Sequence, residues 1–343
     1  MPEPKVVWMP AGLDGCALYR MFFAHLRMAG SLFMFNPYGL DVKAFEGCNV
    51  VVVQRLSSQQ NYEALLLFKK QGMKVVYDLD DDLWSVPVYN PAHSVMKKWL
   101  PGFEICASMA DLVTVSTIHL KVMVSQALGK KAPRIEVVEN ALDFDWFRPL
   151  SQQYRKEKNG RVVVGWAGTN THEGDTKQVF DLIPELMREI PEMDFELVGA
   201  PIPENMKEFG DRVRDREFVP VAEFAANWAS WQWDISLAPV QENKFNLSKS
   251  NIKMIEAASV SIPCVASKFG EYHKFAKHSR LLTDRVVANS RRTWKEKISA
   301  LVKDAELRKQ VGEEMNLIAN KHYNILNRVQ DWNMLFRQVL GVA

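Results

Sequence analysis

The sequence predicts an α/β protein built from two Rossmann-like, doubly wound domains. Short apolar segments alternate with helical segments in both halves, and the segments at 49–54 and 74–79 are continuously apolar in the manner of parallel strands. The alternation restarts after a polar, charged stretch at 151–160, which we interpret as an interdomain linker. A chain of 343 residues is long enough for two domains of ordinary size.

The composition is that of a soluble globular protein, with 47% hydrophobic and 24% charged residues. The net charge of +2 gives no argument for a nucleic-acid or membrane partner. Four scattered cysteines without CxxC spacing are expected to be reduced: Cys16, Cys48, Cys106 and Cys264. The sequence shows neither a signal-peptide pattern nor an apolar run long enough for a transmembrane segment. We therefore expect a cytoplasmic protein.

The first half contains five predicted strands and four predicted helices. The strands lie at 5–9, 49–54, 74–79, 111–115 and 135–138, and the helices at 16–29, 59–71, 92–109 and 117–128. Gly72 follows the second helix as its C-cap. A strand, a glycine-containing turn and a helix, in that order from residue 5 onward, are the start of a doubly wound domain.

The turn after the first strand carries Gly12 and Gly15 but lacks the GxGxxG spacing of a dinucleotide-binding site. Two interpretations remain open. The glycines either form a tight turn between strand and helix, or let a ligand approach the backbone closely.

The strand at 74–79 runs into an acidic tract at 78–82, which contains four aspartates. In an open α/β sheet this edge is where ligands bind, and carboxylates there require solvent, cations or hydrogen-bond donors. Three interpretations compete. The tract is an acidic loop that caps the next helix, a polar wall for substrate hydroxyls with a base such as Asp80, or a carboxylate pair that binds a divalent metal.

The second half repeats the same alternation. We predict strands at 162–166, 195–198, 218–220, 235–239 and 262–266, and helices at 176–190, 221–231, 253–261, 291–302 and 304–340. Residues 212–216 form a basic cluster that we interpret as a solvated face, and 268–272 are predicted to be a turn.

The segment at 245–267 carries the clearest ligand chemistry. Its polar loop, with Lys249, Ser250 and Asn251, opens into a short helix whose free backbone N–H groups suit a phosphate. Lys253 lies four residues after Lys249 and therefore on the same helix face. Glu256, one turn further on, is placed to accept hydrogen bonds from a ribose diol.

A second loop, at 167–175, follows the first strand of the second half. Its small residues, among them Gly168, precede a helix, which is the arrangement that a diphosphate requires. His172 in this loop either contacts the ligand or caps the helix.

Three tracts resemble the group 1 (GT4-like) glycosyltransferases of the GT-B fold. Residues 261–267, Ser-Ile-Pro-Cys-Val-Ala-Ser, match the family's G-x-P-V-V-A-S strand. Four positions match the family's mid-chain turn P-N-G-V-D-x-x-x-F-x-P: Asn140, Asp143, Phe147 and Pro149. The tract Y-D-L-D-D-D-L-W-S-V-P, from Tyr77, resembles one found in GT4-like enzymes of bacteria and phages.

The chain also departs from the family pattern. The family has two glutamates eight residues apart, and Glu256 matches the second, whereas Ser248 occupies the position of the first. Glu139 and Ala141 replace the Pro and Gly of the mid-chain turn. Relatives place an Arg and a Lys near the diphosphate, and here Lys249, Lys253 and His172 would have to supply that charge.

The resemblance implies two domains facing a cleft. The first, 1–150, would bind the acceptor and the second, 151–321, the donor, while a C-terminal helix at about 322–343 would return to the first domain with Trp332 and Phe336 packed there. The implied reaction moves a sugar from a nucleotide-diphosphate sugar, a UDP-sugar first of all, to a hydroxyl. It would proceed with retention of configuration and without a metal or other cofactor.

The implied site residues divide into three groups. Lys249, Lys253 and Asp80 would carry the catalysis. The donor would contact Gly168, Thr169, Asn170, His172, Val219, Ser250, Asn251 and Glu256. The acceptor would meet Gly12, Asp14, Gly15, Arg20 and Asp81.

Several alternatives stay open. The acceptor could be a saccharide, a protein, a small molecule or a hydroxymethylated base in DNA, for which a groove of basic residues would be required: Lys97, Lys98, Lys130, Lys131 and Arg134. Scattered solvated lysines are the alternative to that groove. The chain could also be a nucleotide-sugar binding module with reduced catalysis, as Ser248 suggests, or a GT-B-shaped epimerase or phosphorylase. A metal site at 78–82 would be typical of the GT-A fold, which the rest of the chain argues against.

Overall fold

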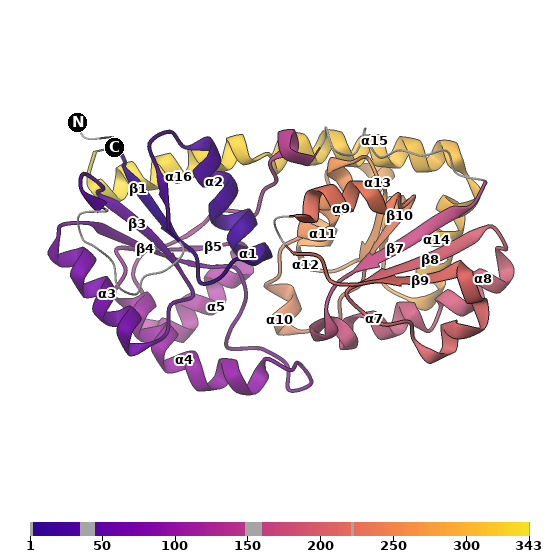
Figure 1. The fold of residues 1–343 in the computed structure, drawn as a ribbon, viewed down its shortest axis with the longest axis horizontal. Coiled ribbons are helices and arrows are strands. Elements are labelled where there is room, and N and C mark those ends of the chain that lie inside the picture. Colours follow the sequence, from indigo (N-terminus) through magenta and orange to yellow (C-terminus); the bar gives the residue numbers. More distant parts are fainter. Residues whose placement is uncertain (1–2, 35–44, 148–159, 221–222, 343) are drawn as a thin grey trace.

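The computed structural model describes residues 3–34, 45–147, 160–220 and 223–342, which form two α/β domains side by side (Figure 1). Each domain contains a six-stranded sheet in which every described strand pair is parallel. This confirms the predicted fold class. The linker predicted at 151–160 lies outside the described residues except for Gly160.

The first sheet has the strand order β2-β1-β3-β4-β5-β6. Its strands are β1 (Val6–Met9), β2 (Leu32–Phe33), β3 (Val50–Gln54), β4 (Lys74–Leu79), β5 (Leu112–Val115) and β6 (Ile135–Val137). The helical elements of this domain are α1 (Gly15–Ala17), the π-helical turn η1 (Leu18–Phe22), α2 (Phe23–Arg27), α3 (Gln59–Lys70), α4 (His93–Ser108), α5 (Ile118–Leu128) and the 3₁₀ turn η3 (Gly129–Lys131).

The second sheet has the order β12-β11-β10-β7-β8-β9. Its strands are β7 (Val162–Ala167), β8 (Met193–Val198), β9 (Val213–Arg216), β10 (Ile235–Ala238), β11 (Cys264–Ser267) and β12 (Val287–Ala288). The helical elements are η4 (Asn170–His172), α7 (Glu173–Phe180), α8 (Ile183–Glu189), η5 (Glu204–Arg212), α9 (Phe224–Trp231), α10 (Lys244–Leu247), α11 (Ile252–Ser259), α12 (Gly270–Ala276), α13 (Arg280–Arg285), α14 (Arg291–Lys303) and α15 (Ala305–His322). The last helix, α16 (Ile325–Leu340), lies beyond this domain.

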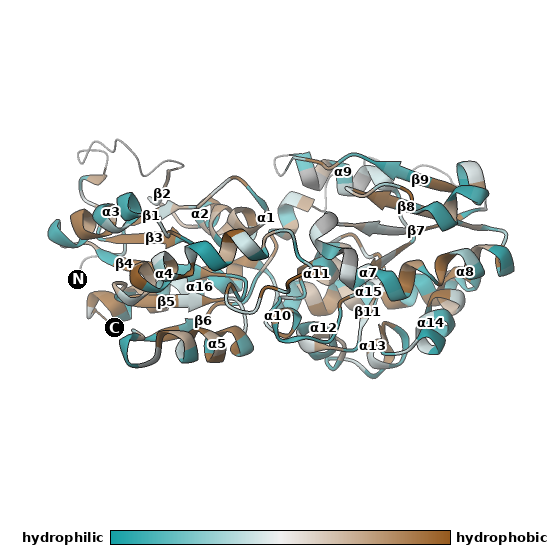
Figure 2. Ribbon diagram, turned by 90° about the horizontal axis from the view of Figure 1, so that it is seen from below, coloured by the Kyte–Doolittle hydropathy of each residue, from teal (hydrophilic) through white to brown (hydrophobic). Residues whose placement is uncertain are grey.

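The inner strands form the core of each domain because most of their side chains are apolar and helices cover both faces. All residues of β1, β3 and β5 are buried, and β3 shows the hydrophobic colour in Figure 2. Among the described residues, no helix combines the length and the apolarity that crossing a bilayer requires.

Helix boundaries differ from the prediction where local contacts override helical spacing. The helix expected at 16–29 includes the π-helical turn η1 and ends at Arg27. The helix expected at 304–340 is broken between α15 and α16, where Asn324 caps α16 and forms a β-bridge with Leu142. The helix expected at 176–190 is two helices, the second with Pro184 in its first turn.

Two predictions for the second domain were wrong in type, whereas the cluster interpreted as a solvated face at 212–216 is largely exposed. The basic cluster at 212–216 is largely the edge strand β9, whose Arg214 and Arg216 are half exposed and pair with the buried Glu196. Residues 218–220 are not a strand, and 268–272 contain the start of α12. The hydrophobic pattern does not identify β9 as a strand, because most of its residues are charged. Ion pairs with the neighbouring strand compensate these charges.

Helix α16 packs against the first domain, after α15 has packed against α11 of the second (Figure 1). Trp332 and Phe336 of α16 meet Trp8 of β1, with ring centroids 5.2 Å and 5.8 Å apart in edge-to-face contacts. The guanidinium of Arg20 lies 5.8 Å from the Trp332 ring. The C-terminal residues are therefore part of the core of the first domain.

Replacing Trp332 by Ala should lower the free energy of unfolding by about 3–5 kcal/mol, because it leaves a cavity against Trp8. The measurement is chemical denaturation of the full chain. Trp99→Ala is the matched control, since Trp99 is 46% exposed whereas Trp332 is 1% exposed. Equal losses for both variants would contradict a core role for α16.

Candidate functional site

The candidate site lies where the carboxyl edges of the two sheets come together. In the second sheet the strand order reverses between β7 and β10, and the crevice at such a reversal is the usual ligand site of open α/β sheets. The loops after these strands, at 168–172 and 239–251, contain most of the predicted donor residues. The loops after β1, β3 and β4 form the opposing edge of the first sheet.

Three hydrogen bonds join the segment at 248–256 to the first domain. The Tyr19 hydroxyl donates to Glu256, Asn140 Nδ2 donates to Ser250 Oγ (2.8 Å), and Thr117 Oγ1 donates to the carbonyl of Ser248 (2.9 Å). Two of the predicted donor residues, Ser250 and Glu256, therefore lie directly against the first domain. We call this boundary the domain junction.

Lys253 contacts several residues of the predicted donor side. Its ammonium donates to the carbonyl of Ala167 (2.8 Å) and lies 4.9 Å from the centroid of the Trp166 ring. A Cβ atom at Gly168 would lie 2.5 Å from the Trp166 ring and 3.1 Å from Lys253 Nζ, so the ring excludes a side chain at Gly168 and Lys253 lies close to its backbone. Burial and then the charge of Lys249 lower the pKa of Lys253 to about 8. The structure thus brings the lysine and the glycine loop together.

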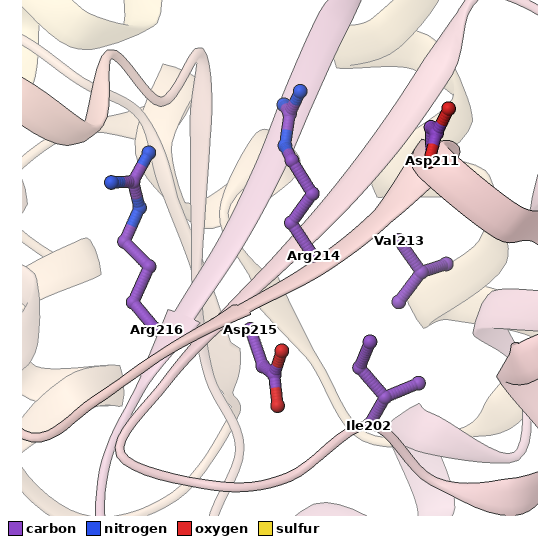
Figure 3. Close-up of a pocket in the computed structure, with 6 residues that line it drawn as sticks. All are labelled: Ile202, Asp211, Val213, Arg214, Asp215 and Arg216. Carbon is purple, nitrogen blue, oxygen red and sulfur yellow. The ribbon is translucent and has the colours of Figure 1, made fainter.

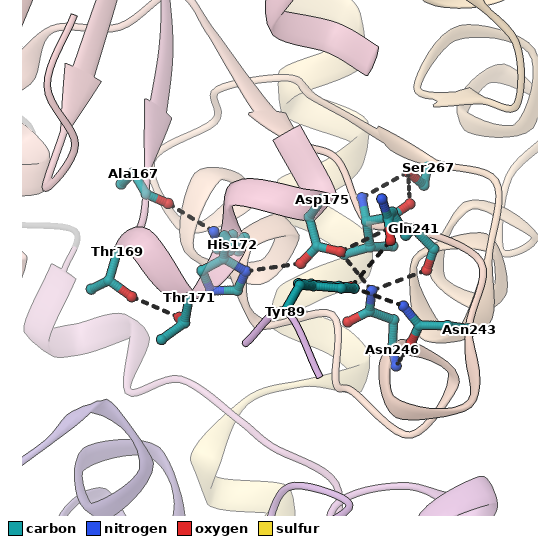
Figure 4. Close-up of polar contacts among 12 residues, drawn as sticks. Tyr89, Ala167, Thr169, Thr171, His172, Asp175, Gln241, Asn243, Asn246 and Ser267 are labelled. Atoms are coloured by element: carbon teal, nitrogen blue, oxygen red, sulfur yellow. Dashed lines mark hydrogen bonds and ion pairs between the residues drawn. The ribbon is translucent and has the colours of Figure 1, made fainter. Parts of the chain in front are cut away.

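His172 is held neutral beside this lysine. The charge of Lys253 and then burial lower the pKa of His172 to about 3, while its Nδ1 contacts Asp175 Oδ2 at 3.1 Å. Figure 4 shows Asp175 between His172 and the loop after β10, where its Oδ1 accepts from Gln241 N (2.9 Å) and Asn246 Nδ2 (2.6 Å). With His172 neutral, the ammoniums of Lys253 and Lys249 exceed the Asp175 carboxylate by one positive charge, which favours an anion here.

The remaining predicted donor residues occupy three places. Thr169 Oγ1 lies 2.8 Å from Thr171 Oγ1 in the glycine loop, whereas the side chain of Asn170 is outside the described part. Asn251 is buried at the start of α11, and Val219 is half-buried beyond β9. Lys249 Nζ lies 4.7 Å from the centroid of the Phe245 ring.

Glu256 is buried in the junction. Burial raises its pKa to about 7, although the hydrogen bond from Tyr19 and the charge of Lys253 act in the opposite direction. Tyr19 reaches Glu256 from η1 of the first domain, so the carboxyl predicted to bind ribose is engaged across the junction.

On the acceptor side, Arg20 lies beneath the surface. It is 2% exposed and binds Asp78 through two hydrogen bonds, Nε to Oδ2 at 3.0 Å and Nη2 to Oδ1 at 2.6 Å. Its Nη1 donates to the carbonyl of Val138 and to Asn140 Oδ1. The structure therefore places Arg20 under the acidic tract, where it neutralises Asp78 and connects β4 to the turn at Asn140.

The other aspartates of the tract have separate environments. Asp82 closes a turn by accepting from the amides of Trp84 and Ser85, and Asp81 is partly exposed. Asp80 is buried, and burial raises its pKa to about 6. Over the described residues, no group of three or more His, Cys, Asp or Glu side chains is arranged to hold a metal ion.

The predicted glycine turn after β1 is organised by Asp14. Its Oδ1 accepts from the amide of Ala17 (2.9 Å), so Asp14 caps α1, and its Oδ2 accepts from Arg55 (2.7 Å). Gly12 and Gly15 flank this carboxylate, and a Cβ at either position would meet nothing closer than 3.6 Å. The backbone there has free space around it.

Two hollows lie in the second domain. One, of about 580 Å³, is lined by α7 and by the loops after β10, β11 and β12, and includes Asp175 and Gln241. The other, of about 530 Å³, lies along the edge strand β9 between Ile202, Asp211 and the residues of β9 (Figure 3). Only the first adjoins the reversal of strand order, so only the first belongs to the candidate site.

Sequence reasoning missed the residues that join the two domains. Tyr19 was not predicted as a site residue, because a tyrosine on a helix is usually a core residue. Thr117 was predicted only as the first residue of a helix. Phe218, next to the selected Val219, is 67% exposed beside Gly199. A large exposed aromatic side chain at the carboxyl edge of a sheet is a signal that the sequence alone does not reveal.

Comparison with known proteins agrees with this geometry. A family model described as "Glycosyl transferase-like" matches residues 180–333. A Bacillus subtilis (strain 168) protein named as a teichuronic acid biosynthesis glycosyltransferase, TuaH, is 23% identical over 277 residues, covering 78% of this chain and 66% of TuaH. This chain thus spans just under two thirds of that relative's length.

Solved structures match the whole chain. A sucrose-phosphate synthase from Thermosynechococcus elongatus gives a TM-score of 0.68 at 13% identity, covering 99% of this chain and 100% of that one. HepE from Anabaena, solved with UDP-glucose, gives the same TM-score, identity and coverage. A glycosyltransferase from Rickettsia africae gives 0.68 at 12% identity, with complete coverage of both chains. The GT-B architecture predicted from the sequence is confirmed.

Replacing Glu256 by Gln should change how stability depends on pH. A carboxyl whose pKa is about 7 when folded and near 4.5 when unfolded binds its proton more tightly in the folded state. The wild type should therefore lose free energy of unfolding relative to Glu256→Gln as the pH rises from about 4.5 to about 7. Denaturant unfolding at several pH values measures this, with the exposed Glu306→Gln as control. A constant difference between wild type and Glu256→Gln would contradict the raised pKa.

Proposed function

We propose that this chain, a GT-B glycosyltransferase of the group 1 type, transfers a sugar from a nucleoside diphosphate sugar to an acceptor hydroxyl. The observation that carries the proposal is the approach of Lys253 to Gly168 at the strand-order reversal of the second sheet. An ammonium, a glycine loop and the start of α11 together offer the charge and the backbone N–H groups that a diphosphate needs. UDP is the first choice of nucleotide, supported by the HepE complex with UDP-glucose.

In the proposed reaction the leaving diphosphate gains negative charge as its bond to the anomeric carbon breaks. Lys253 and Lys249 lower the barrier because they stabilise this charge more strongly in the transition state than in the bound donor. The acceptor oxygen forms the new bond to the anomeric carbon, and its proton leaves to a base on the acceptor side, for which Asp80 is the candidate. Retention of configuration and independence of metal are part of the proposal, carried over from the resemblance to group 1 enzymes.

Glu256 is proposed to bind the ribose hydroxyls once the donor is present. In the structure its carboxyl accepts from Tyr19, so ribose would replace that hydroxyl as the donor to Glu256. Ser248, at the position of the family's other glutamate, is buried and its carbonyl accepts from Thr117. Sugar recognition in this chain therefore relies on groups other than a carboxylate at 248.

The proposed acceptor is a saccharide or a small polyol. Asp14, Asp80 and Asp81 surround the acceptor side, and their carboxylates oppose the approach of a DNA phosphate backbone. Lys97 and Lys98 lie exposed on α4, Lys130 and Lys131 lie exposed on η3, and Arg134 binds Glu136 and Gln338. These basic residues are distributed over three elements, which favours solvated side chains over a DNA groove.

An assay of donor hydrolysis separates an enzyme from a binding module. The purified chain is incubated with UDP-glucose and UDP-N-acetylglucosamine without acceptor, and free UDP is measured with and without EDTA. Slow release of UDP, unchanged by EDTA, is expected for a metal-independent transferase. Binding of UDP without any release would favour the module, and release that requires a divalent ion would remove metal independence from the proposal.

Replacing Lys253 by Met should raise the Kd for UDP about 10- to 100-fold, because a charge-assisted bond to phosphate contributes about 1.5–3 kcal/mol. In the wild type the Kd should rise as the pH increases through about 8, where Lys253 loses its proton. Titration calorimetry measures both effects. Lys244→Met, an exposed lysine on α10, should bind UDP as the wild type does. An unchanged Kd in Lys253→Met would refute the assigned diphosphate site.

A further inference from the structure

Three charged side chains converge at the carboxyl edge of the first sheet. Asp14 lies in the loop after β1, Arg55 directly follows β3, and Asp80 directly follows β4. Arg55 Nη2 donates to Asp14 Oδ2 at 2.7 Å, while Arg55 Nε lies 4.0 Å from Asp80 Oδ1. The thiol of Cys16, on α1, forms a hydrogen bond with the Asp80 carboxyl group. Arg55 was not among the residues selected from the sequence.

Two atoms of this group are buried and have no hydrogen-bond partner among the described residues: Arg55 Nε and Asp80 Oδ1. Asp80 as a whole is only 7% exposed. A buried donor and a buried acceptor without hydrogen bonds are unfavourable, although the two groups attract each other as an ion pair across the gap. One is a donor and the other an acceptor, and both belong to the same 4.0 Å gap.

The distance across this gap suits a bridging hydroxyl oxygen. An atom about 2.8 Å from each partner is compatible with a separation of 4.0 Å between them, at an angle near 90°. A hydroxyl accepts one hydrogen bond and donates another, so it can accept from Arg55 Nε and donate to Asp80 Oδ1 at once. A carboxylate or phosphate oxygen cannot do this, because it has no proton to donate to Asp80.

The backbone of Arg55 is strained in a way that supports this role. Its φ of +48° lies in the left-handed region, which residues with a side chain rarely adopt. The other described non-glycine residues with positive φ, Gln232 and Ser261, follow the ends of helices α9 and α11, where this conformation is common. Arg55 instead follows a strand.

We propose that Asp80 and Arg55 form the seat for the reacting hydroxyl of the acceptor, and that the acceptor is uncharged around that hydroxyl. This inference rests on the proposed function and identifies the substrate class of its acceptor side. The Asp14, Asp80 and Asp81 carboxylates outnumber the single guanidinium there, so an acid on the acceptor next to the reacting carbon would be repelled. The Asp78 charge does not add to this surplus because Arg20 pairs with it.

The seat depends on the ionised form of Asp80. Burial raises the pKa of this carboxyl to about 6, and Arg55 acts against that shift. The other groups facing it are Asp81 and Asp78 of the same tract, which raise the pKa, and Cys16, whose hydrogen bond lowers it. Below about pH 6 the protonated Asp80 would donate rather than accept, and the hydroxyl would lose its orientation.

Hydrolysis of UDP-glucose tests the seat, because water then takes the place of the acceptor hydroxyl. Asp80→Asn and Arg55→Gln should each lower the rate of UDP release at least tenfold, with the Kd for UDP within twofold of wild type. The wild-type rate should fall as the pH decreases through about 6. Arg55→Gln should move that midpoint upward, and Asp80→Asn should abolish it. Arg292→Gln, an exposed arginine paired with Glu296 on α14, is the matched control.

Rates within twofold of wild type in both variants, with pH profiles unchanged, would overturn the seat while leaving the proposed function intact. Failure of the wild type to bind UDP would instead contradict the proposed function. Crystals of the wild type soaked in glycerol decide the seat independently of the donor. An oxygen within about 3.2 Å of both Asp80 Oδ1 and Arg55 Nε is expected, and clear density without one would refute the inference.

Discussion

The rest of the site depends on the contacts of the partly buried Lys253 ammonium. Removing a charge from water is costly, and here one carbonyl, from Ala167, and the face of Trp166 are its nearest recorded partners. These contacts do not fully replace the lost hydration of the ammonium, and the pKa of Lys253 is therefore lowered. The same charge keeps His172 neutral. An anion entering between Lys253 and the Gly168 loop would supply a countercharge, which is the basis of the diphosphate site proposed there.

The two domains contribute different charged groups to their junction. The second offers lysines and a glycine loop, whereas the first offers a row of aspartates at the ends of its strands. Parallel strands all end at one edge, so both sets gather at the edges that meet. This division suits a reaction between an anionic donor and an uncharged hydroxyl. It also explains why the carboxylates of the acidic tract have separate partners, with Asp78 held by Arg20 and Asp82 by a turn.

Hydrogen bonds across the domain junction link the predicted donor and acceptor sides. Tyr19 belongs to the same short helical stretch as Arg20, so a movement of η1 would reach both Glu256 and Asp78. The π-helical geometry of η1 places these neighbouring residues toward different domains, and such turns are frequent at functional sites. Helix α16 packs against Trp8 of the first domain.

The amino-acid sequence by itself determined the α/β class, the two-domain plan and most strand positions, because apolar strands and glycine turns report local geometry directly. The sequence also predicted that Lys249, Lys253 and Glu256 lie near one another, since helical spacing places them on neighbouring turns of one short segment. Only the tertiary structure decided that Tyr19 meets Glu256, that Arg20 lies beneath Asp78, and that Arg55 faces Asp80. These pairs are separated by 237, 58 and about 25 residues. Which strand ends become neighbours depends on sheet order and domain packing, and no local pattern in the chain records it.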